Sequence, residues 1–171
     1  MTREVIPSGS ALGADIKGID FSKPLSDDDR AFVKQAWNDH LVVRFRDQDL
    51  SDEDLVRLAD DFGGSQVAGS RQYYINAGYD TKSGRVSHLP GITIISNLDR
   101  DGNPEKENSG TGSSELYWHT DNSYVDNPPK GSILYGIQVP INGGGDTSFV
   151  NQYETYEALP MAMKERLLNL H

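Results

Sequence analysis

Cysteine is absent from the 171 residues of the chain. Disulfide bonds, thiolate catalysis, zinc fingers and iron–sulfur ligation are therefore excluded here, and any metal ion must be held by nitrogen and oxygen ligands. Basic residues are also scarce, because 16 lysines and arginines stand against 26 aspartates and glutamates, for a formal net charge of −10. A nucleic-acid partner is not expected, since such a surface repels the phosphate backbone.

Long apolar runs are missing as well. No stretch approaches the roughly 18 residues that a membrane-spanning helix needs, and the N-terminal letters MTREVIPSGS lack the basic and then apolar regions of a secretory signal. We therefore expect a cytoplasmic protein without a membrane partner. With 36% hydrophobic and 25% charged residues, and no internal repeat or linker, the chain is expected to form a single domain over residues 1–171.

Helices are expected where a capping residue precedes an apolar, periodic stretch. Ser26 and Ser51 are each followed three residues later by an aspartate, as in a capping box, and then by apolar residues at helical spacing. Between these two helices, the run LVVRF predicts a short buried strand. Near the C-terminus, Asn151 is a candidate helix cap, and Pro160 is suited to begin another helix after a break.

Further strands are expected in β-branched and aromatic runs that glycine, proline or asparagine interrupts. These runs cover residues 4–21, 91–97, 115–121, 131–139 and 146–150. The polar stretch between residues 65 and 90 has no clear periodicity and is expected to form a loop. Because strands concentrate in the middle, with helices before and after, the pattern predicts an α+β domain around an antiparallel sheet or barrel.

The stretch ELYWHTDNSY contains a histidine and an aspartate two positions apart. In a strand, alternate residues point to the same face, so His119 and Asp121 would project together. An imidazole nitrogen and a carboxylate oxygen could share a divalent cation, and a second histidine from elsewhere would complete a 2-His-1-carboxylate triad. The alternative is a histidine that is only hydrogen-bonded to its neighbour, since roughly 0.4 accidental H-x-D matches are expected in so acidic a chain.

The order of several motifs gives a more specific signal than the H-x-D pair. Along the chain, YWHTDNSY, PPKGSILYGIQVP and GGGDTSFVNQYETYEAL resemble the family of taurine dioxygenase and 2,4-dichlorophenoxyacetate dioxygenase. The resemblance runs from about Ile16 to the C-terminus and is to the N-terminal part of such proteins. It implies a double-stranded β-helix, a cupin-like jelly roll with flanking helices, that is incomplete in this chain.

The resemblance also implies an activity, cofactors and site residues. The enzyme would be an Fe(II)- and 2-oxoglutarate-dependent dioxygenase that uses O2 to hydroxylate or otherwise oxidise a small organic acid or amino-acid-like substrate, releasing succinate and CO2. His119 and Asp121 would be catalytic as the first two iron ligands, and Thr147 would contact the distal carboxylate of 2-oxoglutarate. Candidate substrate contacts are Tyr73, Asn122 and Tyr124. The last two require a bend after the ligand pair, because an unbroken strand would direct them to the opposite face.

A distal histidine and an arginine that the family uses are not found in this chain. The resemblance makes His171 a non-ligand at the end of a helix. Three explanations stay open: the sequence is the first part of a longer enzyme, a second polypeptide supplies a complementing C-terminal segment, or the protein is a non-catalytic binding module. A different metal oxygenase on a cupin-like barrel, and assembly as a homo-oligomer, are left open too.

Overall fold

The computed structural model describes residues 2–67, 71–82, 86–96, 103, 117–143, 146–168 and 170. The chain divides into two compact units, Met1–Asp49 with Thr147–His171, and Leu50–Asp146. Each unit has its own secondary structure. The single domain expected over residues 1–171 stays a prediction.

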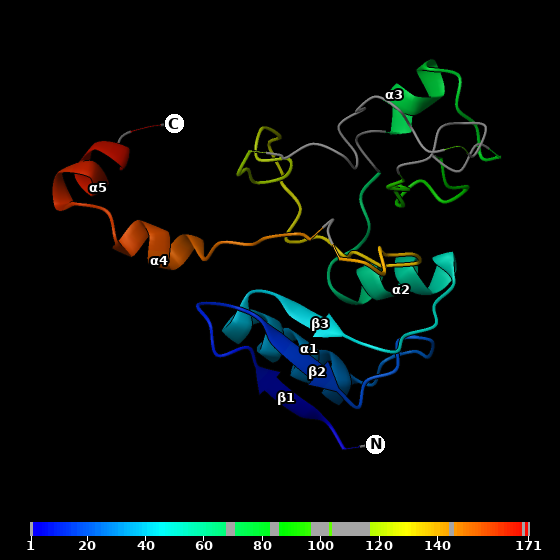
Figure 1. The fold of residues 1–171 in the computed structure, drawn as a ribbon, viewed down its shortest axis with the longest axis horizontal. Coiled ribbons are helices and arrows are strands. Elements are labelled where there is room, and N and C mark those ends of the chain that lie inside the picture. The colour runs from blue at the N-terminus through cyan, green and yellow to red at the C-terminus, as the bar shows by residue number, and fades with distance from the viewer. Residues whose placement is uncertain are drawn as a thin grey trace. The chain divides into compact units, whose positions relative to one another are not determined.

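The first unit contains a three-stranded sheet in the order β1–β2–β3 (Figure 1). β1 (Glu4–Pro7) and β2 (Ala14–Lys17) are antiparallel, with Val5 opposite Ile16, whereas β3 (Val43–Phe45) runs parallel to β2. The strands expected in the N-terminal segment and in LVVRF are thus confirmed. The sheet is mixed because a helical crossover, rather than a hairpin, joins β2 to β3.

That crossover contains α1 (Asp27–His40). The Ser26 hydroxyl accepts a hydrogen bond at 3.1 Å from the backbone N–H three residues further on, which confirms the expected cap. The helix buries Val33 and Ala36, and strand residues such as Ile16, which is 4% exposed, complete the core of this unit. The helix start and the core face of the helix therefore follow from local sequence signals.

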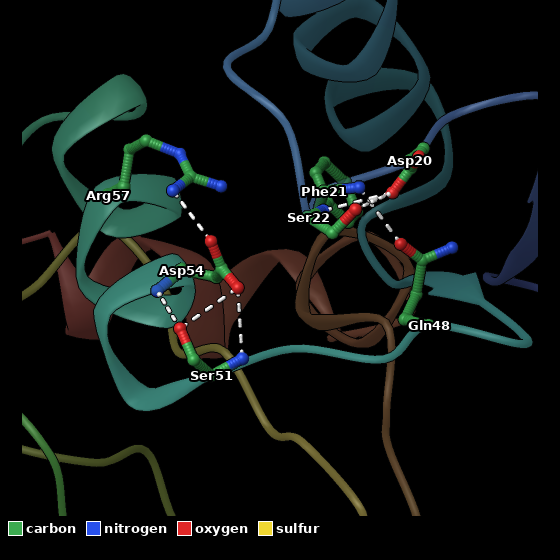
Figure 2. A network of polar contacts seen from close by, with 7 residues as sticks. All are labelled: Asp20, Phe21, Ser22, Gln48, Ser51, Asp54 and Arg57. Carbon is green, nitrogen blue, oxygen red and sulfur yellow. Dashed lines mark hydrogen bonds and ion pairs between the residues drawn. The ribbon is translucent and has the colours of Figure 1, made fainter.

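Gln48 joins the segments that flank the sheet. Its side-chain amide accepts a hydrogen bond from the Phe21 N–H at 3.0 Å (Figure 2) and donates one to the Ile19 carbonyl at 3.1 Å. The Phe21 ring packs edge-on against Phe45, with ring centroids 4.6 Å apart. These bonds provide partners for backbone groups at the margin of the core, where unpaired donors would be costly.

Two short helices of the C-terminal part belong to the same unit. Asn151 caps α4 (Gln152–Glu157) by accepting hydrogen bonds from two backbone N–H groups, and Pro160 is the N-cap residue of α5 (Met161–Leu167). Both helix starts agree with the prediction from the sequence. The Asn151 amide also donates to the Ala11 carbonyl at 2.7 Å, which attaches the start of α4 to the turn between β1 and β2.

The second unit contains α2 (Asp52–Asp61), which begins with a complete capping box. Ser51 accepts from the Asp54 N–H at 3.1 Å, and the Asp54 carboxylate accepts from the Ser51 N–H at 2.9 Å (Figure 2). This confirms the second predicted helix. None of the helices in the described residues is long and apolar enough to span a membrane.

A further helix, α3 (Arg71–Asn76), occupies a stretch for which the sequence predicts only a loop. Its Tyr74 is 9% exposed and contacts the rings of Tyr73 and Tyr79 edge-on, at centroid distances of 5.5 and 5.6 Å. The helix is short and is held by this local aromatic packing. A periodic apolar pattern, the signal that identifies longer helices, is therefore not available in the sequence.

The strands predicted in the middle of the chain are not formed by the described residues. No strand is found in residues 117–121, 131–139 or 146–150. The predicted strand at 91–97 is reduced to an isolated bridge between Val86 and Thr93. Residues 97, 115 and 116 lie outside the described part of the chain. β-Branched composition favours a strand, but a strand also needs a paired neighbour, and the described segments provide none.

Candidate metal centre

His119 and Asp121 lie side by side in the second unit. The Nε2 atom of His119 is 3.2 Å from the Oδ1 atom of Asp121, and the side chains are 55% and 68% exposed. The two groups converge as the spacing predicts. They do so from an irregular segment followed by a turn at residues 121–124, however, and not from a strand.

The backbone carbonyl of Tyr117 determines which ring nitrogen of His119 carries the hydrogen and which keeps a lone pair. The Nδ1 atom lies 2.7 Å from this carbonyl oxygen, which can only accept, so Nδ1 carries the hydrogen and Nε2 keeps its lone pair in the neutral ring. Nε2 and the Asp121 carboxylate are then two acceptors in contact, which is favourable when a proton or a metal ion lies between them. The hydrogen bond to Tyr117 and, after it, the charge of Asp121 raise the pKa of His119 above its usual value.

The donor chemistry of this pair fits a divalent transition metal in part. One imidazole nitrogen and one carboxylate oxygen are two of the three protein ligands in a 2-His-1-carboxylate site. No group of three histidine, aspartate or glutamate side chains that could hold a metal ion is found among the described residues. His171 lies outside those residues. The described residues therefore offer two candidate ligands at this place, and no third candidate is grouped with them.

A turn follows the pair, as the predicted substrate contacts of Asn122 and Tyr124 would require. Asn122 has a left-handed backbone with a φ of 52°, and the Val125 N–H donates to its carbonyl at 3.3 Å. The Tyr124 hydroxyl donates to the Asn122 side-chain oxygen, also at 3.3 Å. Asn122 and Tyr124 are thus brought together, next to the ligand pair in the sequence.

The two remaining candidate residues, Tyr73 and Thr147, lie on other segments of the chain. The Tyr73 side chain lies on α3, is 70% exposed and contacts the ring of Tyr74. Thr147 is exposed and belongs to the first unit. Their roles in substrate and 2-oxoglutarate binding stay predictions.

The sequence did not identify Ser87, which attaches a loop to the first turn of α2. Ser87 is 3% exposed, its hydroxyl donates to Asp52 at 3.1 Å, and its carbonyl accepts from the Arg71 guanidinium. Beside it, Nε2 of His88 lies 3.3 Å from the Glu53 carboxylate. The partners of Ser87 are 35 and 16 positions away, so no local motif signals this role.

Comparison with known proteins gives matches over nearly the whole chain. The family model described as taurine catabolism dioxygenase TauD, TfdA family matches residues 4–171. The chain is 33% identical over 161 residues to pentalenolactone F synthase of Streptomyces avermitilis. The aligned segment covers 93% of this chain and 48% of that protein. It is 32% identical over 164 residues to an alkylsulfatase of Acinetobacter baylyi, with 94% of this chain and 44% of that protein covered.

A third relative is the alpha-ketoglutarate-dependent 2,4-dichlorophenoxyacetate dioxygenase of Cupriavidus pinatubonensis. It is 25% identical over 170 residues, which cover 96% of this chain and 55% of that protein. The chain thus spans about half the length of the curated relatives that it matches. Since the family model matches from the first strand to the last helix, the chain belongs to the TauD/TfdA family.

Proposed function

We propose that this chain supplies the metal-binding part of an Fe(II)- and 2-oxoglutarate-dependent dioxygenase. Dioxygenases of the TauD/TfdA family use Fe(II) and 2-oxoglutarate. The observation that carries the proposal is the 3.2 Å contact between Nε2 of His119 and the Asp121 carboxylate, with Nδ1 engaged by Tyr117. This arrangement presents a nitrogen lone pair and a carboxylate oxygen to one cation.

In the proposed enzyme, His119 and Asp121 hold the iron, and the Tyr117 carbonyl orients the histidine ring. The bound iron and 2-oxoglutarate supply the oxidising chemistry, with O2 as the oxidant and succinate and CO2 as products. Thr147 contributes its hydroxyl to the distal carboxylate of 2-oxoglutarate. The distal histidine and the arginine that the family uses are not assigned to residues of this chain.

The substrate that we propose is a small organic acid or an amino-acid-like molecule. The name of the 2,4-dichlorophenoxyacetate dioxygenase supports this class, because its substrate is a carboxylic acid. Tyr124 and Tyr73 are 84% and 70% exposed and offer apolar rings with polar ends, while the Asn122 amide can donate to a carboxylate. These three side chains are the proposed substrate contacts.

We further propose that the chain is part of a double-stranded β-helix. Every second position from 133 to 141 is apolar or aromatic: Ile133, Tyr135, Ile137, Val139 and Ile141. The four aliphatic side chains among them are between 49% and 96% exposed. Apolar side chains at a period of two are typical of a strand that buries one face. Their exposure supports a jelly roll in which further strands cover this face.

The test is an anaerobic titration of the full-length protein with Fe(II) and 2-oxoglutarate. A visible metal-to-ligand charge-transfer band is expected with the wild type and not with Asp121→Ala, which removes one iron ligand. Asp126→Ala is the matched control, because Asp126 is an exposed aspartate five residues further on, and this variant is expected to keep the band. Absence of the band in the wild type would refute the proposal.

A second candidate function is a non-catalytic binding module. It is favoured by the lack of a third metal ligand among the described residues. In that case no succinate forms from 2-oxoglutarate with any substrate, and Asp121→Ala leaves ligand binding intact. Measurement of succinate release by wild type and variant distinguishes the two functions.

A further inference from the structure

Asn122 directly follows the candidate ligand pair and has an unusual backbone conformation. Its φ of 52° is left-handed, and among the described residues other than glycine only Leu41 and Asp47 also have a positive φ. This conformation is unfavourable for residues with a Cβ atom, although asparagine tolerates it better than most. Backbone strain of this kind is concentrated at functional sites, where the surrounding structure maintains it for a reason.

The conformation changes the direction of the chain immediately after the carboxylate ligand. In an unbroken strand, Ser123 would project from the same face as His119 and Asp121, because alternate residues share a face. The left-handed residue interrupts that alternation. The chain turns instead, and the Val125 N–H bonds to the Asn122 carbonyl at 3.3 Å. The residues that follow therefore do not continue along the face on which the two ligands meet.

Two different features of Asn122 support this turn. One is the backbone itself, through its φ and through the bond from Val125. The other is the side-chain oxygen, which accepts from the Tyr124 hydroxyl at 3.3 Å. A substitution can separate them, because glycine keeps the left-handed backbone and loses the side chain, whereas a β-branched residue disfavours the backbone conformation.

We propose that Asn122 is a positioning residue whose left-handed backbone turns the chain away from His119 and Asp121 and so keeps the face on which they meet open for metal binding. This inference rests on the proposed function, since it requires that the pair binds a metal ion. It assigns to the backbone of Asn122 a task that is separate from any contact of its amide with substrate.

The experiment measures the affinity of the full-length protein for Mn(II), by electron paramagnetic resonance of the free ion. Asn122→Val is expected to weaken binding about tenfold. A β-branched residue rarely adopts a positive φ, so fewer molecules have the turn that allows the metal ion to bind. Asn122→Gly is expected to bind within about twofold of the wild type, because glycine accepts the same backbone. Ser123→Val places the same side chain one residue later, where φ is not positive, and is the matched control.

The control is expected to bind within about twofold of the wild type, because valine is compatible with a negative φ. Equal losses in Asn122→Gly and Asn122→Val would overturn the inference, since the amide and not the backbone would then matter. Wild-type affinity in Asn122→Val, or an equal loss in Ser123→Val, would overturn it as well.

Thermal unfolding of the same variants separates positioning from general stability. The unfolding temperature is expected to fall little in Asn122→Val, because the turn can give up its left-handed conformation locally while the helices and strands of the described structure, which do not include it, stay folded. A fall in unfolding temperature that accounts for the lost affinity would overturn the positioning role. Failure of the wild type to bind Mn(II) is a different result, which would count against the proposed function itself.

Discussion

At the scale of single residues, the candidate site depends on a backbone atom as much as on two side chains. The Tyr117 carbonyl accepts the Nδ1 hydrogen of His119, so the lone pair of Nε2 is directed at Asp121. The convergence of the pair agrees with its spacing, which places alternate residues of a strand on one face, although the described segment is irregular and not a strand. The part played by the Tyr117 carbonyl cannot be predicted from the sequence, since every residue type has a backbone carbonyl. The left-handed conformation of Asn122 has no sequence signal beyond the tolerance of asparagine for it.

This arrangement predicts the tautomer of the neutral His119 ring. The hydrogen is expected on Nδ1, because the Tyr117 carbonyl needs a donor at 2.7 Å. Long-range proton–nitrogen correlation spectra, recorded above the raised pKa of His119, measure it directly. The spectrum of His40, which lies at the end of α1, provides the internal comparison. A neutral His119 ring protonated at Nε2 would contradict the geometry described here.

At the scale of elements, the start of α2 is hydrogen-bonded to two other segments of the second unit. Its first turn holds the loop at Ser87 through Asp52, and the Leu50 N–H just before it donates to the Tyr135 hydroxyl at 3.2 Å. The helices that begin with a side-chain cap could be predicted from the sequence, because a cap and its partner lie within a few residues of each other. The helix α3 could not, because it is short and is held by local aromatic packing without a periodic apolar pattern. The absence of a strand at 131–139 could not be predicted either, because a strand depends on pairing with residues distant in the sequence.

The capping box of α2 predicts a loss of stability in Ser51→Ala. The free energy of unfolding is expected to fall by about 1 kcal/mol, because the N–H group at Asp54 loses its acceptor. Urea denaturation followed by circular dichroism measures the change. Ser10→Ala is the control, since Ser10 is an exposed serine outside the helices, and it is expected to leave the free energy unchanged. Equal stability of Ser51→Ala and Ser10→Ala would contradict the capping role.

The capping box of α2 also predicts that the stability of the folded state depends on pH. The bond from the Ser51 N–H and, after it, the Arg57 guanidinium lower the pKa of Asp54 below 3.8. A carboxylate with a lowered pKa stabilises the folded state above its unfolded pKa, so this contribution is present at neutral pH. This contribution to stability is lost only as the pH falls below 3.8, the ordinary pKa of the carboxyl group, and then through its lower pKa in the folded protein. Titration of the Asp54 carboxyl carbon by nuclear magnetic resonance checks the direction, and Arg57→Ala is expected to shift the midpoint upwards.

At the scale of the whole molecule, the acidic residues of a chain of net charge −10 offer divalent cations other places to bind than the proposed metal site. Acidic clusters such as Asp27, Asp28 and Asp29 in the first turn of α1 attract any divalent cation weakly. The proposed site must therefore be selective, and we expect it to be, since a histidine nitrogen beside a carboxylate binds a transition metal more tightly than surface carboxylates alone.

The most direct measurement is paramagnetic broadening of nuclear magnetic resonance signals during a titration with substoichiometric Mn(II). We expect the signals of His119 and Asp121 to broaden first, and those of the acidic turn of α1 to broaden only at higher Mn(II) concentrations. In Asp121→Ala, the early broadening at His119 should disappear. Broadening that spreads evenly over the acidic surface, with no preference for His119 and Asp121, would contradict a metal centre at this pair.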